Sequence, residues 1–357
     1  FSYFVKNIYG DSMKNSVDLS KFNIRTDLII DDFDKEENKN HLDRVKYDYK
    51  DIHISRIKLS KENSKQYNKD PGIYVTIEFP DITNYENKKD LEDILEKELK
   101  NIYKYMNIKD NDNCLIIGLG NEKSTPDSLG PKVLNRIMVT RHLFLLANSE
   151  VSEGVRNVSI FTPNVMGNTG IESADIINNV VKSTNPKFLI AIDALASNSI
   201  SRINRTIQIT DSGIHPGSGI GNNRKEISKK TIGIPVIAIG IPTVTDASTV
   251  IGDTINYLYK HISYIKSNYN QSKLTYTRKN YIEKLKNKDL TKEEKKEVGG
   301  LLGELDEYEL KELFDEVLTS IDYNMMVTVK EIDFIIEKLS DIVSSSLNKS
   351  LHKNFLG

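Results

Sequence analysis

The stretch Cys114-Leu115-Ile116-Ile117-Gly118-Leu119-Gly120-Asn121 is an apolar run that ends in small and polar residues. A second apolar run, Phe188-Leu189-Ile190-Ala191-Ile192, ends directly in Asp193. Such runs are typical of parallel strands that are buried on both faces and that present functional groups at their C-terminal ends. Asp127 follows the first run, just past Pro126. We therefore predict that Asp127 and Asp193 converge on one crevice at the edge of a sheet.

Strand and helix patterns alternate around these two runs. Strands are expected at 114–119, 158–162, 188–193, 206–210 and 235–241, and helices at 127–146, 171–182 and 246–265. This alternation predicts an α/β fold in which a doubly wound, mostly parallel sheet carries helices on both faces. Two alternating segments, 52–59 and 73–79, predict an N-terminal β-hairpin region, and 91–106 has the apolar spacing of an amphipathic helix.

The composition suggests how the chain is divided. A length of 357 residues with 38% hydrophobic residues suits one large α/β domain with attachments, or two domains. We expect an N-terminal extension over 1–30, an α/β core with the hairpin insertion over 31–265, and a polar linker over 266–290. A C-terminal helical region, 291–357, is expected to pack on the core. Met13 could be an internal start, and residues 13–50 resemble a loosely held arm with one apolar island at Leu28-Ile29-Ile30.

Charge and cysteine usage exclude several classes of protein. The net charge is -2, from 49 basic and 51 acidic side chains, so no strong field favours nucleic acid or an anionic membrane. No apolar run approaches the roughly 20 residues of a membrane span. The single cysteine, Cys114, lies inside an apolar strand and allows no intramolecular disulfide. These features favour a cytoplasmic protein that has no direct nucleic-acid or membrane partner.

Paired carboxylates suit the activation of water. Two carboxylates held close together cannot both ionise easily, so one keeps a proton while the other accepts one from water. Hydrolysis is therefore the expected reaction class. Taken alone, Asp127 is typical of a helix N-cap, a role that does not exclude catalysis. Asp193 itself ends an apolar strand, where a buried charge would be costly without a partner.

A glycine-rich loop from Asp211 to Asn222 offers further candidates. His215 is either a hydrogen-bonded loop histidine or a third metal ligand beside the two aspartates. Arg224 and Lys225 follow the loop and are either solvated or form a cationic subsite for an acidic substrate side chain, with Gly213 and His215 as further substrate contacts.

Two arginines, Arg202 and Arg205, are weaker candidates for the same cationic subsite. Gly118-Leu119-Gly120 invites a dinucleotide interpretation, but Lys123 stands where the third glycine is required. No P-loop, HExxH or GxSxG motif occurs, so no cofactor is predicted.

Several motifs together resemble the germination proteases of spore-forming bacteria. The motifs are Ser124-Thr125-Pro126-Asp127-Ser128-Leu129-Gly130-Pro131, Thr140-Arg141-His142-Leu143-Phe144, Val165-Met166-Gly167, Thr169-Gly170-Ile171-Glu172, Ala191-Ile192-Asp193-Ala194-Leu195-Ala196, the loop from Asp211 to Gly219, Ile237 to Val244, and Asn324-Met325-Met326-Val327-Thr328. The likeness runs from about Met13 to about His352. Residues 1–12 have no counterpart in the family, and Ser128 stands where a smaller alanine is common.

The resemblance implies an endopeptidase that degrades small acid-soluble spore proteins early in germination, in the cytoplasm of the forespore and the spore core. Catalysis in the family is assigned to two aspartates, and the matching positions here are Asp127 and Asp193. The implied fold is similar to that of hydrogenase maturation proteases, in which an acidic pair and a histidine gather around a metal. A metal-assisted peptidase that uses Asp127, Asp193 and His215 is therefore an alternative.

The family also implies an inactive homotetrameric precursor, or zymogen, that removes its own N-terminal propeptide. Cleavage prefers a bond between an acidic and a hydrophobic residue, so Asp27–Leu28 is the expected site. A further alternative, from another class, is a non-catalytic protein whose glycine loops bind a phosphate ligand.

Overall fold

The computed structural model describes residues 27–33, 43–64, 67, 69–146, 151, 153–217, 224–267, 285, 289–320 and 325–353. Contacts divide these residues into two compact units. The sheet unit comprises the described parts of 27–197, 201–244 and 328–353, and the helical unit those of 198–200 and 245–327.

The sheet has the strand order β1-β2-β3-β7-β8-β6-β4-β5. Its strands are β1 (Asp43–Tyr49), β2 (Ile52–Leu59), β3 (Gly72–Glu78), β4 (Cys114–Gly118), β5 (Val158–Phe161), β6 (Phe188–Ala196), β7 (Thr206–Thr210) and β8 (Val236–Asp246). Strands β5, β4, β6 and β8 are parallel neighbours. The pairs from β8 through β7, β3 and β2 to β1 are antiparallel. The α/β class is confirmed, but the sheet is mixed, with parallel pairing confined to one half.

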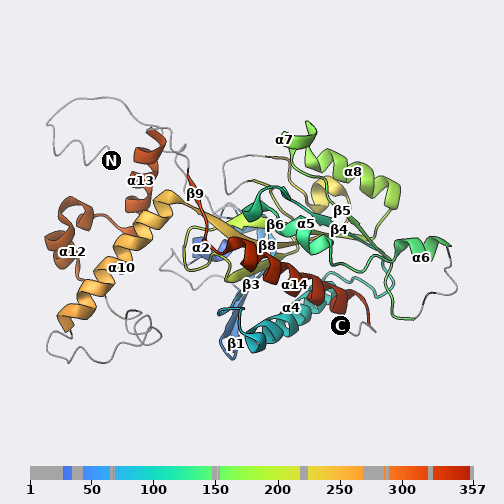
Figure 1. The fold of residues 1–357 in the computed structure, drawn as a ribbon, viewed down its shortest axis with the longest axis horizontal. Coiled ribbons are helices and arrows are strands. Elements are labelled where there is room, and N and C mark those ends of the chain that lie inside the picture. The colour runs from blue at the N-terminus through green and yellow to red at the C-terminus, as the bar shows by residue number, and fades with distance from the viewer. Residues whose placement is uncertain are drawn as a thin grey trace. The chain divides into compact units, whose positions relative to one another are not determined.

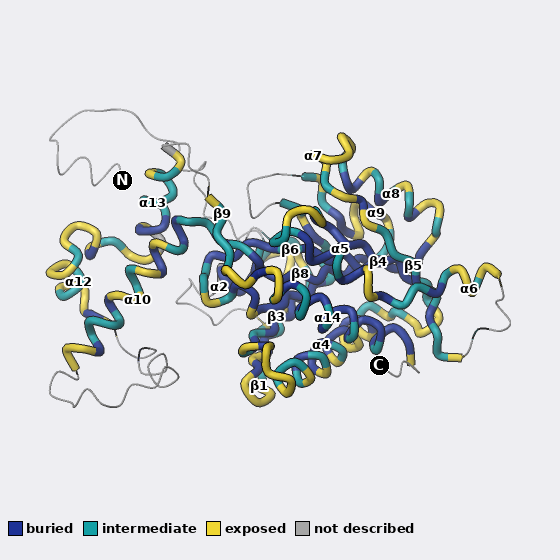
Figure 2. The backbone as a smooth tube through the Cα atoms, viewed as in Figure 1, coloured by how far each residue is buried: buried dark blue, intermediate teal, exposed yellow. Residues whose placement is uncertain are grey.

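The central strands are the apolar runs of the sequence. All five residues of β4 are buried, as are eight of the nine residues of β6, and Figure 2 shows this burial in the middle of the sheet. The edge strand β1 has the polar sequence Asp-Arg-Val-Lys-Tyr-Asp-Tyr, and most of it is exposed. Charged side chains protect an edge strand from further pairing. They also remove the apolar alternation, which is why the sequence did not predict this strand.

Alternate residues of the central strands face two separate cores, each covered by helices. Ile116, Ile190 and Ile239 pack beneath α4 (Tyr85–Tyr105), α5 (Leu129–Leu134) and α14 (Ile332–Leu351). Figure 1 shows α4 and α14 side by side on this face. On the opposite face, Leu115, Leu189 and Ala238 pack with α2 (Ile29–Phe33), α8 (Ser173–Thr184) and α9 (Lys229–Ile232). The prediction of helices on both faces is confirmed.

The helix predicted over 127–146 is broken into three pieces. These are the 3-10 turn η2 (Thr125–Asp127), α5 and α6 (Arg141–Leu146). Between α5 and α6, the buried Thr140 hydroxyl donates to the carbonyl of Arg156 (2.5 Å) and accepts from the N–H of Val158 (2.9 Å). These bonds tie the chain to the start of β5 and interrupt the helix. The remaining short helices of the sheet unit are α3 (Lys61–Ser64) and α7 (Met166–Thr169).

The helical unit contains α10 (Ala247–Ser267), α12 (Lys292–Gly299), the 3-10 helix η5 (Gly300–Glu304), α13 (Glu307–Ser320) and the short strand β9 (Met326–Val327). Its interior holds an ion pair between Lys311 and Asp253 (2.8 Å), two side chains that are almost fully buried. Lys311 also donates to the carbonyl of Asn198 (3.0 Å). Because α14 belongs to the sheet unit, the predicted C-terminal region is divided between the two units. None of the described helices is both long and apolar enough to cross a bilayer.

Candidate active site

Asp193 lies within β6, on the sheet face that carries α2 and α8. Alternation along the strand places it on the same side as Leu189, Ala191 and Leu195, which belong to the core on that face. Only 6% of the residue is exposed, and its Oδ1 accepts the N–H of Ala194 (2.9 Å). Burial raises the pKa of Asp193 well above its usual range, and the negative charges of Asp127 and Asp27 raise it further.

Asp127 is the last residue of η2, and Gly120 allows that turn to lie against the end of β4. Gly120 has a φ of +106°, and a Cβ built on it would lie 2.0 Å from the carbonyl oxygen of Asp127 and 3.0 Å from its Oδ1. The N–H of Asn121 donates to the same carbonyl (3.0 Å). The N-cap of α5 is Ser128. The alternative in which Asp127 caps the following helix is therefore wrong.

The glycines near this turn are required for close packing. A Cβ on Gly118 would lie 2.6 Å from the carbonyl of Gly130, and a Cβ on Gly130 would lie 2.3 Å from the carbonyl oxygen of Leu119. Real Cβ contacts essentially never fall below 3.0 Å. Helix α5 therefore packs directly on the backbone of β4, which accounts for the Gly118-Leu119-Gly120 pattern without a dinucleotide.

Burial makes both aspartates harder to ionise. Burial raises the pKa of Asp127 to about 6, while the Asn121 backbone N–H and the positive charge of Arg224 oppose this rise. The charge of Asp127 itself raises the pKa of Asp193, so the two groups lie close enough to interact. The two carboxylates therefore titrate as a coupled pair, and ionisation of both at once is disfavoured.

The start of the described chain lies beside this pair. Asp27 donates its N–H to the carbonyl of Ala196 (3.2 Å), and its carboxylate accepts the N–H of Ala196 (3.0 Å). The next three residues, Leu28 to Ile30, are at most 1% exposed. The sequence suggested a loosely held arm here, but this part of the arm is buried in the core. We refer to residues 27–33 as the arm.

Arg202 anchors the arm further along. Its guanidinium pairs with Asp31 of the arm and with Glu78 of β3, and the hydroxyl of Ser197 donates to Asp31 (3.1 Å). The sequence suggested Arg202 as a weaker candidate for binding an acidic side chain, and in the structure it binds an acid of its own chain.

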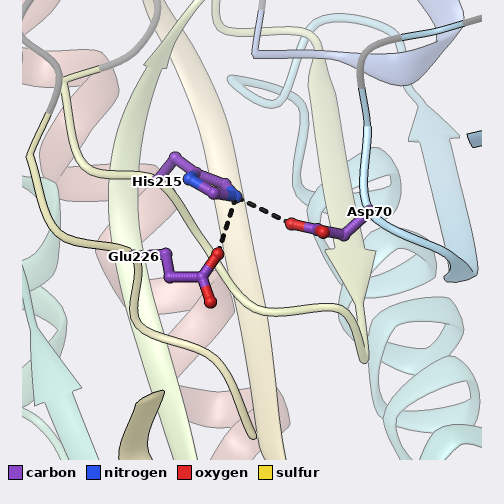
Figure 3. A group of neighbouring side chains, drawn as sticks. All are labelled: Asp70, His215 and Glu226. Atoms are coloured by element: carbon purple, nitrogen blue, oxygen red, sulfur yellow. Dashed lines mark hydrogen bonds and ion pairs between the residues drawn. The ribbon is translucent and has the colours of Figure 1, made fainter. Parts of the chain in front are cut away.

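His215 is grouped with two other acids (Figure 3). Its Nε2 lies 2.8 Å from Oδ2 of Asp70 and 3.7 Å from Oε2 of Glu226. In the described part of the chain, these three form the group of histidine and acidic side chains whose ligand atoms are close enough for a metal ion, and neither catalytic candidate belongs to it. One nitrogen and two carboxylate oxygens are acceptable metal ligands. The 2.8 Å contact is also the ordinary length of a hydrogen bond, which accounts for the position of His215.

The other candidates in and after the glycine-rich loop, Arg224, Lys225 and Gly213, lie in different surroundings. Arg224 lies near Asp127, and its Nη1 is buried without a hydrogen-bond partner among the described residues. Lys225 pairs at the surface with Asp175 of α8 (2.9 Å). Gly213 has a φ of +95°, and a Cβ there would lie 2.4 Å from the carbonyl of Ile227. Of these three residues, Arg224 is the one that the structure brings to the acid pair.

Sequence reasoning missed Gln208 on β7, whose side chain binds the backbone of the arm. Its Nε2 donates to the carbonyl of Asp27 (3.2 Å), and its Oε1 accepts the N–H of Ile29 (2.8 Å). A signal was present, because Thr206, Gln208 and Thr210 place polar residues at every second position of an otherwise apolar strand. Such alternation indicates a polar feature on one face of the sheet.

Comparison with known proteins places this chain in a family. A family model described as germination protease matches residues 24–356. The germination protease of Priestia megaterium is 44% identical over 360 residues, covering 95% of this chain and 96% of the relative. That of Bacillus licheniformis is 42% identical over 358 residues, covering 96% of each. A nickel–iron hydrogenase maturation protease, HycI from Thermococcus kodakarensis, aligns over 41% of this chain and 80% of its own, with 17% identity and a TM-score of 0.26.

The family model and the curated germination proteases define a peptidase, an enzyme that hydrolyses peptide bonds. The chain belongs to the germination protease family. The alternative of a non-catalytic phosphate-binding protein is therefore wrong.

Proposed function

We propose that the chain is the zymogen of an aspartate-dependent endopeptidase that starts the degradation of small acid-soluble spore proteins during germination. The observation that supports this most directly is the buried pair Asp127 and Asp193, with the arm beside it. The proposed enzyme works as a homotetramer in the cytoplasm of the forespore and in the spore core. It needs no cofactor, because the acid pair can supply both the base and the acid.

Asp127 acts as the general base and Asp193 as the general acid. Asp127 is less deeply buried than Asp193 and lies near the positive charge of Arg224, which favours its ionised form, so we assign to it the acceptance of a proton from water. Asp193 is deeply buried and holds its proton, which it can give to the carbonyl oxygen of the scissile bond.

The two aspartates exchange all the protons that the reaction requires. Water adds its oxygen to the carbonyl carbon while Asp127 takes one water proton, and Asp193 protonates the carbonyl oxygen. The carbon–nitrogen bond breaks as Asp127 returns its proton to the leaving nitrogen. Asp193 regains a proton from the collapsing diol, so both groups end in their starting states.

The arm supports self-cleavage between Asp27 and Leu28. Asp27 lies close enough to Asp193 for its charge to act on that group. An acidic residue followed by the buried, apolar Leu28 matches the expected cleavage preference. While it occupies this place, the arm excludes other substrates, which accounts for an inactive precursor.

A metal-assisted mechanism through Asp127, Asp193 and His215 has weaker support. The side chain of His215 is engaged with Asp70 and Glu226, and a direct acid pair explains the chemistry without a metal.

Self-cleavage of the purified full-length chain tests the proposal. The wild type should release a product that begins at Leu28, as read by N-terminal sequencing. Asp127→Asn and Asp193→Asn should stay intact, because each variant lacks one half of the proton transfer. Asp175→Asn is the matched control, since Asp175 is a surface acid paired with Lys225. Processing of either active-site variant at the control rate would refute the proposal.

A further inference from the structure

Gln208 holds the backbone of the arm on both sides of the Asp27–Leu28 peptide bond. The carbonyl that accepts from its Nε2 (3.2 Å) belongs to that bond, and the N–H that donates to its Oε1 (2.8 Å) belongs to Ile29, the second residue after it. A side-chain amide offers the same donor and acceptor as a backbone peptide. These two bonds therefore fix the position of the backbone whatever side chains the segment carries.

The register of the sheet places Gln208 on the same face as Asp193. Both residues pair with Gly240 of β8, one from β7 and the other from β6. Residues paired in register point to the same side of a sheet, and two strand spacings separate them by about 9 to 10 Å. The side chain of Leu195 of β6 covers Gly240, because a Cβ built there would lie 2.3 Å from Leu195 Cδ1. The arm, whose backbone Gln208 binds and whose Asp27 acts electrostatically on Asp193, therefore lies near both residues on this face.

Burial keeps this arrangement rigid. Gln208 is 6% exposed, and Leu28 and Ile29 beside it are fully buried. Ala196 binds both the N–H and the carboxylate of Asp27. The backbone of β6 therefore binds Asp27, on the N-terminal side of the peptide bond. Gln208 binds the carbonyl of that bond and the N–H of Ile29 that follows it.

We propose that Gln208 is a catalytic residue that binds the scissile carbonyl of the segment to be cut and stabilises the charge that develops on its oxygen. This inference rests on the proposed self-cleavage at Asp27–Leu28. The carbonyl oxygen can accept from Gln208 and from Asp193 together, because it has two lone pairs. The bond to Ile29 positions the chain after the cut, and once the arm has left, an incoming substrate makes the same two bonds.

The test measures the rate of self-cleavage of the full-length chain in Gln208→Met, Gln208→Glu and a control, Thr206→Val. Thr206 lies two residues earlier on the same face, is fully buried, and its hydroxyl has no hydrogen-bond partner among the described residues. The control should cleave within about twofold of the wild type. Gln208→Met should be roughly 100-fold slower, because the loss of one donor to a developing oxyanion typically costs 10²–10³ in rate.

Gln208→Glu separates a catalytic role from a structural one. At neutral pH a carboxylate cannot donate, so this variant should be as slow as Gln208→Met. As the pH falls, a protonated Glu regains a donor, and its rate relative to the wild type should recover about tenfold or more, while the ratio for Gln208→Met stays flat. Rates within threefold of the control for both variants, or a flat ratio for Gln208→Glu, would overturn the inference.

A variant that fails to fold would be replaced by a change in the arm. Ile29→Pro removes the N–H that Gln208 accepts, and proline suits the first residue of a helix. It should cleave about tenfold more slowly than Ile29→Ala, and equal rates would count against Gln208. If the wild type does not produce Leu28 as its new N-terminus, the proposed cleavage bond and this inference both fail. Normal cleavage with unaffected Gln208 variants defeats the Gln208 inference alone.

Discussion

Replacing Gly120 by alanine should displace Asp127 and slow the enzyme without unfolding it. A Cβ at Gly120 would lie 2.0 Å from the carbonyl oxygen of Asp127. Because real Cβ atoms keep at least 3.0 Å from such an oxygen, the two segments must separate by about 1 Å. A misplacement of this size at a catalytic group can cost about 10²-fold in rate. We therefore expect Gly120→Ala to lower kcat about 100-fold.

Gly120→Ala also strains the backbone, and a control variant separates this strain from the displacement of Asp127. Gly120 has a φ of +106°, and a non-glycine residue in a left-handed conformation costs roughly 1–2 kcal/mol. Gly233 has a φ of +83°, but a Cβ there meets nothing within 4 Å. Gly233→Ala is therefore the matched control, with similar backbone strain and no displacement of Asp127.

The assay compares the thermal midpoint and the cleavage of an acid-soluble spore protein by matured Gly120→Ala and Gly233→Ala. Both variants should lose stability, but Gly120→Ala alone should lose most of its activity. If the two variants cleaved at rates within threefold of each other, the close packing of Gly120 against Asp127 would not position the catalytic group.

Three further expectations follow from the site. Because burial raises the pKa of Asp127 to about 6 and the base must be ionised, the rate of self-cleavage should fall about tenfold per pH unit below pH 6; a rate unchanged from pH 7 to pH 5 would contradict this role. Arg224→Ala should weaken the preference of the matured enzyme for Glu over Gln before the cut by about tenfold, because the substrate carboxylate loses the guanidinium whose buried Nη1 has no hydrogen-bond partner among the described residues. Lys225→Ala, the control, should keep the preference, and an unchanged preference in Arg224→Ala would exclude this role. Exhaustive chelation should leave activity intact, and a loss restored by added zinc would favour the metal-assisted alternative.

Much of the fold could be predicted because its central strands are apolar runs. The strands that begin at Cys114 and Phe188 start at the predicted residues, since only buried strands tolerate such continuous apolar sequence. Strand β7 also starts at the predicted residue, Thr206, because its polar and apolar residues alternate. The direction of β7 could not be predicted, because strand composition does not record whether a neighbour runs parallel or antiparallel. The break after α5 depends on the tertiary bonds of Thr140, which no local pattern reveals.

The acid pair was accessible from sequence, but its surroundings were not. Asp193 could be found because a charge at the end of an apolar run requires an explanation. The grouping of His215 with Asp70 joins residues 145 positions apart, and no spacing rule connects them. Arg202 was a candidate for an acidic ligand, but its partner, Asp31, lies in a segment that the sequence suggested was loosely held.

The most direct test of the central claim is digestion of a purified acid-soluble spore protein by enzyme that carries Asp127→Asn or Asp193→Asn. Each variant should be matured with trace wild-type enzyme, which is then removed. If one aspartate takes a proton from water and the other gives one to the carbonyl, both variants should lose at least 10²-fold in kcat, while Asp175→Asn keeps its rate. Either aspartate variant digesting the spore protein at the rate of Asp175→Asn would contradict the account.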